Sequence, residues 1–177
     1  PEDANCPVCD MKSANFPEWN AQAVHEDDTR EFFCTSGCAT TYYVEPARFA
    51  ETDAAVAGLW VTGFESSEFI DGMEAYYALE TDSDRVDDPM RLNPAPFADR
   101  EDAVAYVDEV DYLTSDDIVE LSAFDRELAT QYRARFLEDE SDTGEEYQAV
   151  EVPEDANCPV CDMKSANFPE WNAQAVH

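Results

Sequence analysis

Short alternating apolar runs, separated by acidic turns, mark the first third of the chain. Ser36 and Gly37 after Thr35 are a helix start signal, and Pro46 is a stop signal, so a helix of about two turns is expected between them. The predicted elements, in chain order, are strands at 20–25 and 30–34, a helix at 38–43 and a strand at 59–62. This segment therefore predicts a β-β-α-β order.

The same order is predicted to recur in the second third of the chain. Apolar residues within 100–110 follow the spacing of an amphipathic helix. The remaining predicted elements are strands at 69–70, 75–79 and 117–121. A final helix is expected because Phe124, Leu128, Tyr132 and Phe136 recur every four residues. The fold class is thus predicted to be α+β, with two small ββαβ units and a C-terminal helix.

The domain organisation follows from these elements and from a repeat. The first unit is predicted at 1–63, the second with its terminal helix at 64–137, and an acidic linker at 138–152. Residues 153–177 repeat residues 1–25 without a single change. Cys158, Cys161 and Met163 are therefore copies of Cys6, Cys9 and Met11. A tail that carries half of a site is expected to allow self-association by segment exchange.

Composition limits the classes of partner. The chain has 42 Asp and Glu residues against 10 Lys and Arg residues, a formal net charge of -32, which repels nucleic acid and anionic membrane surfaces. With 44% hydrophobic residues it can still bury a core. We interpret the carboxylates as a solvated surface suited to high salt, and the sequence shows no membrane-spanning run of about 20 apolar residues.

Two cysteine pairs carry the candidate chemistry. Cys6 and Cys9 form a C-x2-C motif, and Cys34 and Cys38 form a C-x3-C motif. Two such pairs are typical of a closed metal site with four ligands. Two disulfides, or buried cysteines without a ligand role, are the alternatives.

The identity of the metal is open on these residues alone. Four thiolates suggest zinc, whereas the thioether of Met11 beside Cys9 is a soft ligand that favours Cu(I). His25 could add an imidazole, and Met90 a further thioether.

The residues around both pairs resemble known metal-binding families. Cys6 to Met11 and Phe32 to Cys38 resemble the YHS and TRASH modules, and the continuation is similar to the nitrous-oxide-reductase accessory family, NosL. The segments that carry the second resemblance are 69–77, 88–90, 96–97, 102–103 and 118–121. The family's Cys-Gly-Met is here Cys9-Asp10-Met11.

This resemblance implies a fold of two ββαβ units and a copper(I) chaperone outside the cytoplasm, commonly anchored by a lipid. It implies Cys9 and Met11 as copper ligands, with Met90 as a further one. Cys34 and Cys38 are more typical of YHS and TRASH modules, so copper, zinc or one of each stays open. The anchor would lie in a segment absent from this chain.

Three functions compete. The favoured one is a copper(I) chaperone that delivers copper to nitrous oxide reductase or to its assembly factors. The alternative is a structural zinc module for protein assembly. An enzyme similar to organomercurial lyase is ranked last, because no cysteine and acid pairing that fits this activity is found, so no enzyme is expected.

Overall fold

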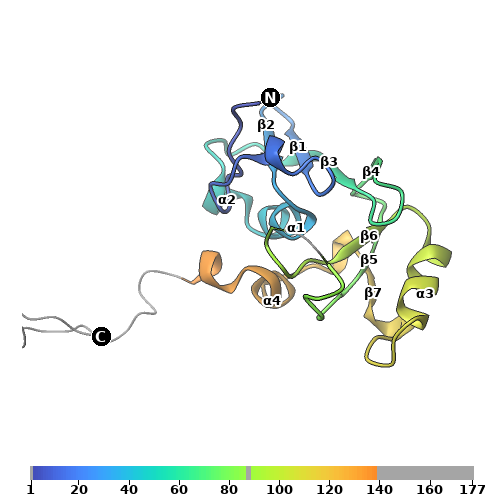
Figure 1. The fold of residues 1–177 in the computed structure, drawn as a ribbon. Coiled ribbons are helices and arrows are strands. Elements are labelled where there is room, and N and C mark those ends of the chain that lie inside the picture. The colour runs from blue at the N-terminus through green and yellow to red at the C-terminus, as the bar shows by residue number, and fades with distance from the viewer. Residues whose placement is uncertain (1, 87–88, 139–177) are drawn as a thin grey trace, which may run out of the picture. The chain divides into compact units, whose positions relative to one another are not determined.

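A four-stranded antiparallel sheet, in the order β2-β1-β3-β4, carries the first part of the chain (Figure 1). The computed structural model describes residues 2–86 and 89–138. The strands are β1 (Ala21–His25), β2 (Arg30–Phe33), β3 (Val56–Thr62) and β4 (Phe69–Asp71). In β1 the residues Ala21, Ala23 and His25 are buried, because every second side chain of this central strand faces the core.

Helix α1 (Ser36–Val44) packs on this sheet and leads directly into the single turn of α2 (Pro46–Phe49). The residues of α1 from Ser36 to Tyr42 are all buried. This burial on every side arises because α1 contacts the sheet and also helix α4 (Arg126–Leu137). Figure 1 shows α1 between the first sheet and α4.

A smaller sheet follows, in the order β6-β5-β7. Its strands are β5 (Tyr76–Ala78), β6 (Ala95–Phe97) and β7 (Ile118–Glu120), and helix α3 (Arg100–Asp108) packs on them. Single 3-10 turns lie at Ser13–Asn15, Ser115–Asp117 and Leu121–Ala123. Pro96 lies in β6, which is an edge strand, where the missing N–H of proline costs no ladder hydrogen bond.

Helix α4 closes the described part of the chain. Asp125 caps it, because its side chain accepts a hydrogen bond of 3.0 Å from the Leu128 N–H. The helix is interrupted at Arg133, whose φ of -138° and ψ of 36° are not helical. Its buried residues are Ala129, Tyr132, Arg133 and Leu137.

The predicted α+β class is confirmed, and the ββαβ order occurs twice, as β1-β2-α1-β3 and as β5-β6-α3-β7. One assignment was wrong. Phe69 and Ile70 pair with β3 in the first sheet and do not begin the second unit. Residues 95–97 take that place instead, and the sequence pattern missed them because Pro96 disfavours a strand.

The final helix also differs in detail from its prediction. Phe124 precedes α4, and the buried face includes Arg133 beside Tyr132. The linker beyond Glu138 and the second copy, with Cys158, Cys161 and Met163, lie outside the described residues. Within residues 2–86 and 89–138, no helix has the length and apolar character that a membrane span requires.

Candidate metal centre

The first cysteine pair lies in the cysteine turn, residues 5–11. The Asp10 N–H donates to the Cys6 carbonyl and the Cys6 N–H to the Met11 carbonyl, both over 2.8 Å, so the turn folds back on itself. Asp10 has a φ of 62°, in the left-handed region. Glycine occupies this region without strain and aspartate tolerates it. Asp10 also accepts a hydrogen bond of 2.9 Å from the Asn5 side chain.

The second pair lies where β2 meets α1. Cys34 follows β2 directly, and Cys38 is the third residue of α1. Thr35 caps the helix, and its hydroxyl oxygen lies 3.5 Å from the Cys38 nitrogen. The predicted placement of Cys38 in the first turn of a helix is confirmed, and this position favours a thiolate.

The two pairs converge on one point. The Sγ atoms of Cys6, Cys9, Cys34 and Cys38, the cysteine cluster, all lie within 4.8 Å of one another. Cys9 Sγ lies 3.3 Å from Cys34 Sγ, which lies 3.7 Å from Cys38 Sγ. Metal–sulfur bonds of about 2.3 Å place the corners of a tetrahedron roughly 3.8 Å apart. The arrangement therefore fits one ion with four sulfur ligands.

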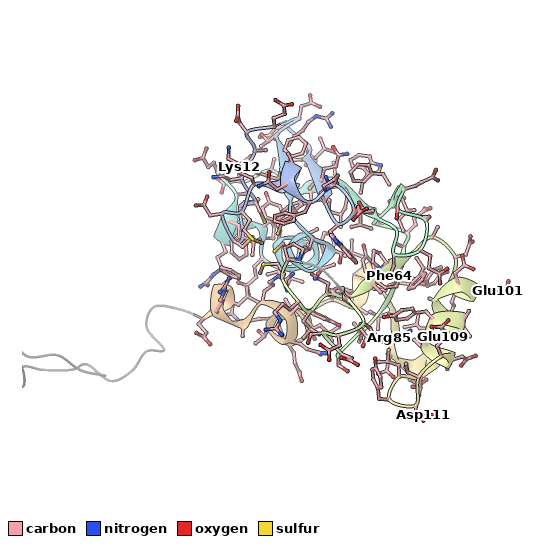
Figure 2. All side chains as sticks on the ribbon, in the orientation of Figure 1. Lys12, Phe64, Arg85, Glu101, Glu109 and Asp111 are labelled. Carbon is pink, nitrogen blue, oxygen red and sulfur yellow. The ribbon has the colours of Figure 1, made fainter. Side chains whose placement is uncertain are left out.

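The cluster is buried on three of its four corners. Cys6, Cys34 and Cys38 are at most 1% exposed, whereas Cys9 is half-buried. Figure 2 shows sulfur atoms, in yellow, gathered beside α1. All four are free thiols, so the disulfide alternative does not describe this structure. An ion held here would be reached from the side of Cys9.

The short distances between the four thiols raise the pKa of some of them and lower the pKa of others. The hydrogen bond from the Cys34 thiol is the largest cause that lowers the pKa of Cys38 well below its ordinary value, and the charge of Arg133 adds to it. The same contact with Cys38 raises the pKa of Cys34. The pKa of Cys9 is also lowered, chiefly by its hydrogen bond with Cys34. Thiolates, which are the metal-binding form, are thus favoured at Cys9 and Cys38.

Arg133 is a residue of this site that the sequence did not reveal. Its Nε donates to Cys38 Sγ over 3.1 Å, from 95 positions further along the chain. Sequence reasoning placed it on a helix with an apolar stripe, and an arginine there is ordinarily exposed. The nonhelical backbone at this residue is a feature that the spacing of the apolar residues did not indicate.

His25 lies outside the cluster. Its Nδ1 is 2.7 Å from the Ala54 carbonyl oxygen, and its Nε2 is 2.6 Å from the Tyr42 hydroxyl. The side chain is 2% exposed. Both ring nitrogens are therefore engaged in holding β1 to α1 and to the loop before β3, and His25 does not join the ligands that we propose.

The two predicted thioether ligands are half-buried. Met11 and Met90 both pack against the hydrophobic core that includes Cys6, Cys34 and Cys38. Met11 also belongs to the cysteine turn, two residues from Cys9. Their role as ligands stays a prediction. Cys158, Cys161 and Met163, the copies of Cys6, Cys9 and Met11, lie outside the described residues.

Comparison with known proteins agrees with the fold and the motifs. The NosL family model matches residues 1–119, which contain the whole cysteine cluster. The structure is similar to that of the copper chaperone NosL from Shewanella denitrificans, with a TM-score of 0.56 and 15% sequence identity. The match covers 72% of this chain and 93% of that chain. No curated protein sequence matches the chain.

Proposed function

The chain belongs to the NosL family, and from this premise we propose that it is a copper(I) chaperone that holds its ion at the cysteine cluster. One observation carries the proposal: four thiol sulfurs from two distant segments lie within 4.8 Å of one another in a mostly buried position. Thiolate sulfur is a soft ligand that suits Cu(I). The role of the protein is metal delivery, with no catalysed reaction.

The uneven burial of the cluster suggests how the ion would leave. Cu(I) is stable with two or three soft ligands, so a fourth ligand position can be vacated during transfer. Cys9 is the half-buried member of the cluster, and Met11 follows it in the same turn. We expect an acceptor's thiolate or imidazole to enter beside Cys9, so that the ion passes from one protein to the other by ligand exchange.

The destination that the family implies is nitrous oxide reductase or the factors that assemble its copper centres. In agreement with the family, we propose that the protein works outside the cytoplasm and is anchored at a membrane.

A structural zinc site is the second candidate, and one observation favours it. The sulfur separations of 3.3 and 3.7 Å are close to the edges of a tetrahedron, and four cysteine ligands are typical of closed zinc sites. A zinc ion held in this way would tie β2, α1 and the cysteine turn together without any transfer.

The test is a metal competition on the reduced chain without bound metal, kept free of oxygen. Cu(I) is titrated against a chromogenic Cu(I) chelator, and Zn(II) against a zinc chelator. We expect tight Cu(I) binding that weakens when Met11 and its copy Met163 are both changed to alanine, while zinc binding stays unchanged. Tight binding of zinc alone, indifferent to both methionines, would establish the structural role instead.

The repeat supports a further proposal on self-association. Residues 153–177 have the same sequence as residues 1–25, so they are able to make the same contacts with Cys34, Cys38 and β2 of another chain. A Cys6→Ser, Cys9→Ser double variant should therefore still bind Cu(I), and do so as a dimer in light scattering. Adding Cys158→Ser and Cys161→Ser should abolish the dimer and weaken Cu(I) binding, because only Cys34 and Cys38 then remain. A double variant that already binds no Cu(I) would refute the exchange.

A further inference from the structure

Arg133 is a buried cation that has no carboxylate among its hydrogen-bond acceptors in residues 2–86 and 89–138. The side chain is 2% exposed, and its guanidinium donates to backbone and side-chain acceptors. These acceptors are Cys38 Sγ at 3.1 Å, Thr35 Oγ1 at 2.8 Å, the Leu92 carbonyl at 2.8 Å, the Tyr132 carbonyl at 2.7 Å and Asn93 Oδ1. The Cys38 sulfur is the member of this set that can carry a negative charge.

A buried charge costs much free energy unless an opposite charge is close to it. Arginine stays protonated at any ordinary pH, so its charge must be balanced by its surroundings. A thiolate at Cys38 supplies that balance, because Nε lies within hydrogen-bond distance of its sulfur. The charge and the thiolate therefore stabilise each other in the interior.

The same guanidinium fixes the start of α1. Thr35, which accepts from Arg133, is the N-cap of α1, and Asn93 accepts from both Arg133 and the Gly37 N–H. A Cβ on Gly37 would lie 2.5 Å from Asn93 Oδ1 and 2.7 Å from Arg133 Nη2, so the absence of a side chain lets the three groups meet. The turn that aims Cys38 is thus held from α4.

We propose that Arg133 is a positioning residue for the metal site: its guanidinium holds Cys38 toward the cluster and offsets one negative charge of the metal–thiolate complex. This inference rests on the proposed function of the cluster. A Cu(I) complex with two or more thiolates carries a net negative charge, and the guanidinium offsets one unit of it. Residues that orient a metal ligand in this way typically change metal affinity by 10- to 100-fold when replaced.

Arg133 lies beyond residue 119, where the match to the family model ends. Helix α4 is therefore a part of this chain's metal site that the matched region does not include. The contribution of α4 comes from Arg133 in particular. The neighbouring Arg135 is exposed, and its guanidinium carbon lies 4.4 Å from the centroid of the Phe136 ring. Arg135 provides a matched control on the same helix.

The experiment measures Cu(I) affinity of the full chain by chelator competition for Arg133→Gln, Arg133→Lys and Arg135→Gln. We expect Arg133→Gln to bind 10- to 100-fold more weakly than the unaltered chain. Arg133→Lys keeps the charge and should recover part of the loss, and Arg135→Gln should bind normally. Arg133→Gln that folds, judged by circular dichroism, and binds Cu(I) with unaltered affinity would overturn the proposal.

A double-mutant cycle separates positioning from a general loss of structure. In a Cys38→Ser background the sulfur that Arg133 contacts is gone, so the further change Arg133→Gln should cost little additional affinity. An equal loss with and without Cys38 would overturn the proposal. If Arg133→Gln does not fold, the same cycle is carried out with Arg133→Lys, which retains the buried charge.

The proposed function and this inference fail in different ways. Should the unaltered chain bind no Cu(I), the chaperone proposal falls. The cycle is then repeated with Co(II), whose thiolate charge-transfer absorption reports ligation by cysteine. Loss of that absorption in Arg133→Gln, but not in Arg135→Gln, would still support the role of Arg133. Equal absorption in both variants would refute it.

Discussion

The sulfur atoms of Cys9 and Cys34 lie 3.3 Å apart across 25 positions of sequence. The contact joins the cysteine turn to the junction of β2 and α1, and it is where the two halves of the cluster meet. Cys9 is half-buried whereas Cys34 is fully buried, so the contact also spans from the surface to the interior. Reactivity of the thiols should follow the same gradient.

Alkylation should therefore be selective for Cys9. In a variant with Cys158→Ser and Cys161→Ser, which removes the copied thiols, iodoacetamide should modify Cys9 at least about tenfold faster than Cys6, Cys34 or Cys38. Exposure and a lowered pKa both favour the reactive thiolate there. Peptide mapping by mass spectrometry gives the four rates. Added Cu(I) should protect Cys9, and equal rates at all four thiols, or no protection, would contradict the placement of the site.

Tyr42→Phe should separate stability from metal binding. The change removes the hydroxyl that lies 2.6 Å from His25 Nε2 and leaves this buried nitrogen unpaired. We expect the free energy of unfolding to fall by about 1–3 kcal/mol, measured by urea denaturation. Cu(I) affinity should stay within about twofold of the unaltered chain. A large loss of Cu(I) affinity without loss of stability would instead make His25 a ligand.

The sequence predicted much of the site because its signals are local. The spacing of Cys6 and Cys9 and the helix start signal after Cys34 were sufficient to place all four sulfurs on turns suited to one ion. A ligand role for His25 stays a prediction, and the residues around it in the sequence do not reveal that Tyr42 and Ala54 lie against its two ring nitrogens. Arg133 was missed for the same reason: its contacts with Cys38 and Thr35 span more than 90 positions.

The fold, like the site, was predicted where the sequence signals are local and was missed where an element depends on distant contacts. Elements with a clear period, such as β1 and α3, were predicted within a few residues. The strand β6 was missed because it forms only by pairing with β5. Pro96 is compatible with a strand there because β6 lies at the edge of the sheet. The pairing of β4 with β3 is likewise a tertiary relationship, which a three-residue strand does not encode by itself.

Asp10 should accept glycine and resist β-branched residues. Its φ of 62° lies in a region that glycine enters freely, and strain there costs other residues about 1–3 kcal/mol. Asp10→Gly relieves the strain but loses the hydrogen bond from Asn5, so stability should change by less than about 1 kcal/mol. Asp10→Val should destabilise the protein by about 2 kcal/mol. Thermal unfolding of both variants tests this, and a stable Asp10→Val would disprove the turn.

Gly37→Ala should weaken both the fold and the metal site. The added Cβ would lie 2.5 Å from Asn93 Oδ1 and 2.7 Å from Arg133 Nη2, closer than real Cβ contacts. Overpacking of this kind typically costs about 1–3 kcal/mol. Because Arg133 must move, Cu(I) affinity should fall by about tenfold or more. Gly58→Ala offers a comparison in β3, where the nearest atom is the tip of the Trp60 ring at 3.0 Å. That variant should leave Cu(I) affinity unchanged.

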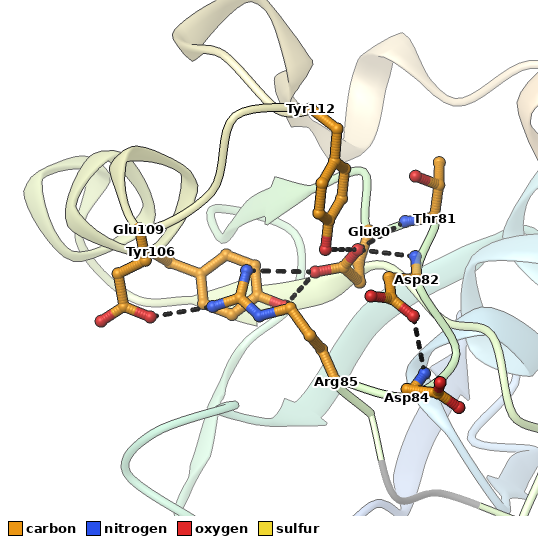
Figure 3. A network of polar contacts seen from close by, with 8 residues as sticks. All are labelled: Glu80, Thr81, Asp82, Asp84, Arg85, Tyr106, Glu109 and Tyr112. Atoms are coloured by element: carbon orange, nitrogen blue, oxygen red, sulfur yellow. Dashed lines mark hydrogen bonds and ion pairs between the residues drawn. The ribbon is translucent and has the colours of Figure 1, made fainter.

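Glu80 gives a control outside the cysteine cluster. Its carboxylate is fully buried and accepts hydrogen bonds from the hydroxyls of Tyr106 and Tyr112, from Arg85 and from the backbone N–H groups of Thr81 and Asp82 (Figure 3). Every partner is a donor, so the charged acceptor fits the network and an amide does not. These contacts tie the segment after β5 to α3 and to Tyr112.

Glu80→Gln should therefore destabilise the protein without changing its Cu(I) affinity. The amide group of glutamine would direct its own donors at groups that also donate, and Arg85 would lose its buried counter-charge. Breaking a buried pair costs about 3–5 kcal/mol. Glu109→Gln also removes a carboxylate bonded to Arg85, but at 68% exposure it should cost less than about 1 kcal/mol. Urea denaturation compares the two variants, and Cu(I) titration of the folded fraction should match that of the unaltered chain in both. Equal stabilities would mean that the network does not support the second sheet, and a loss of Cu(I) affinity would mean that it reaches the cysteine cluster.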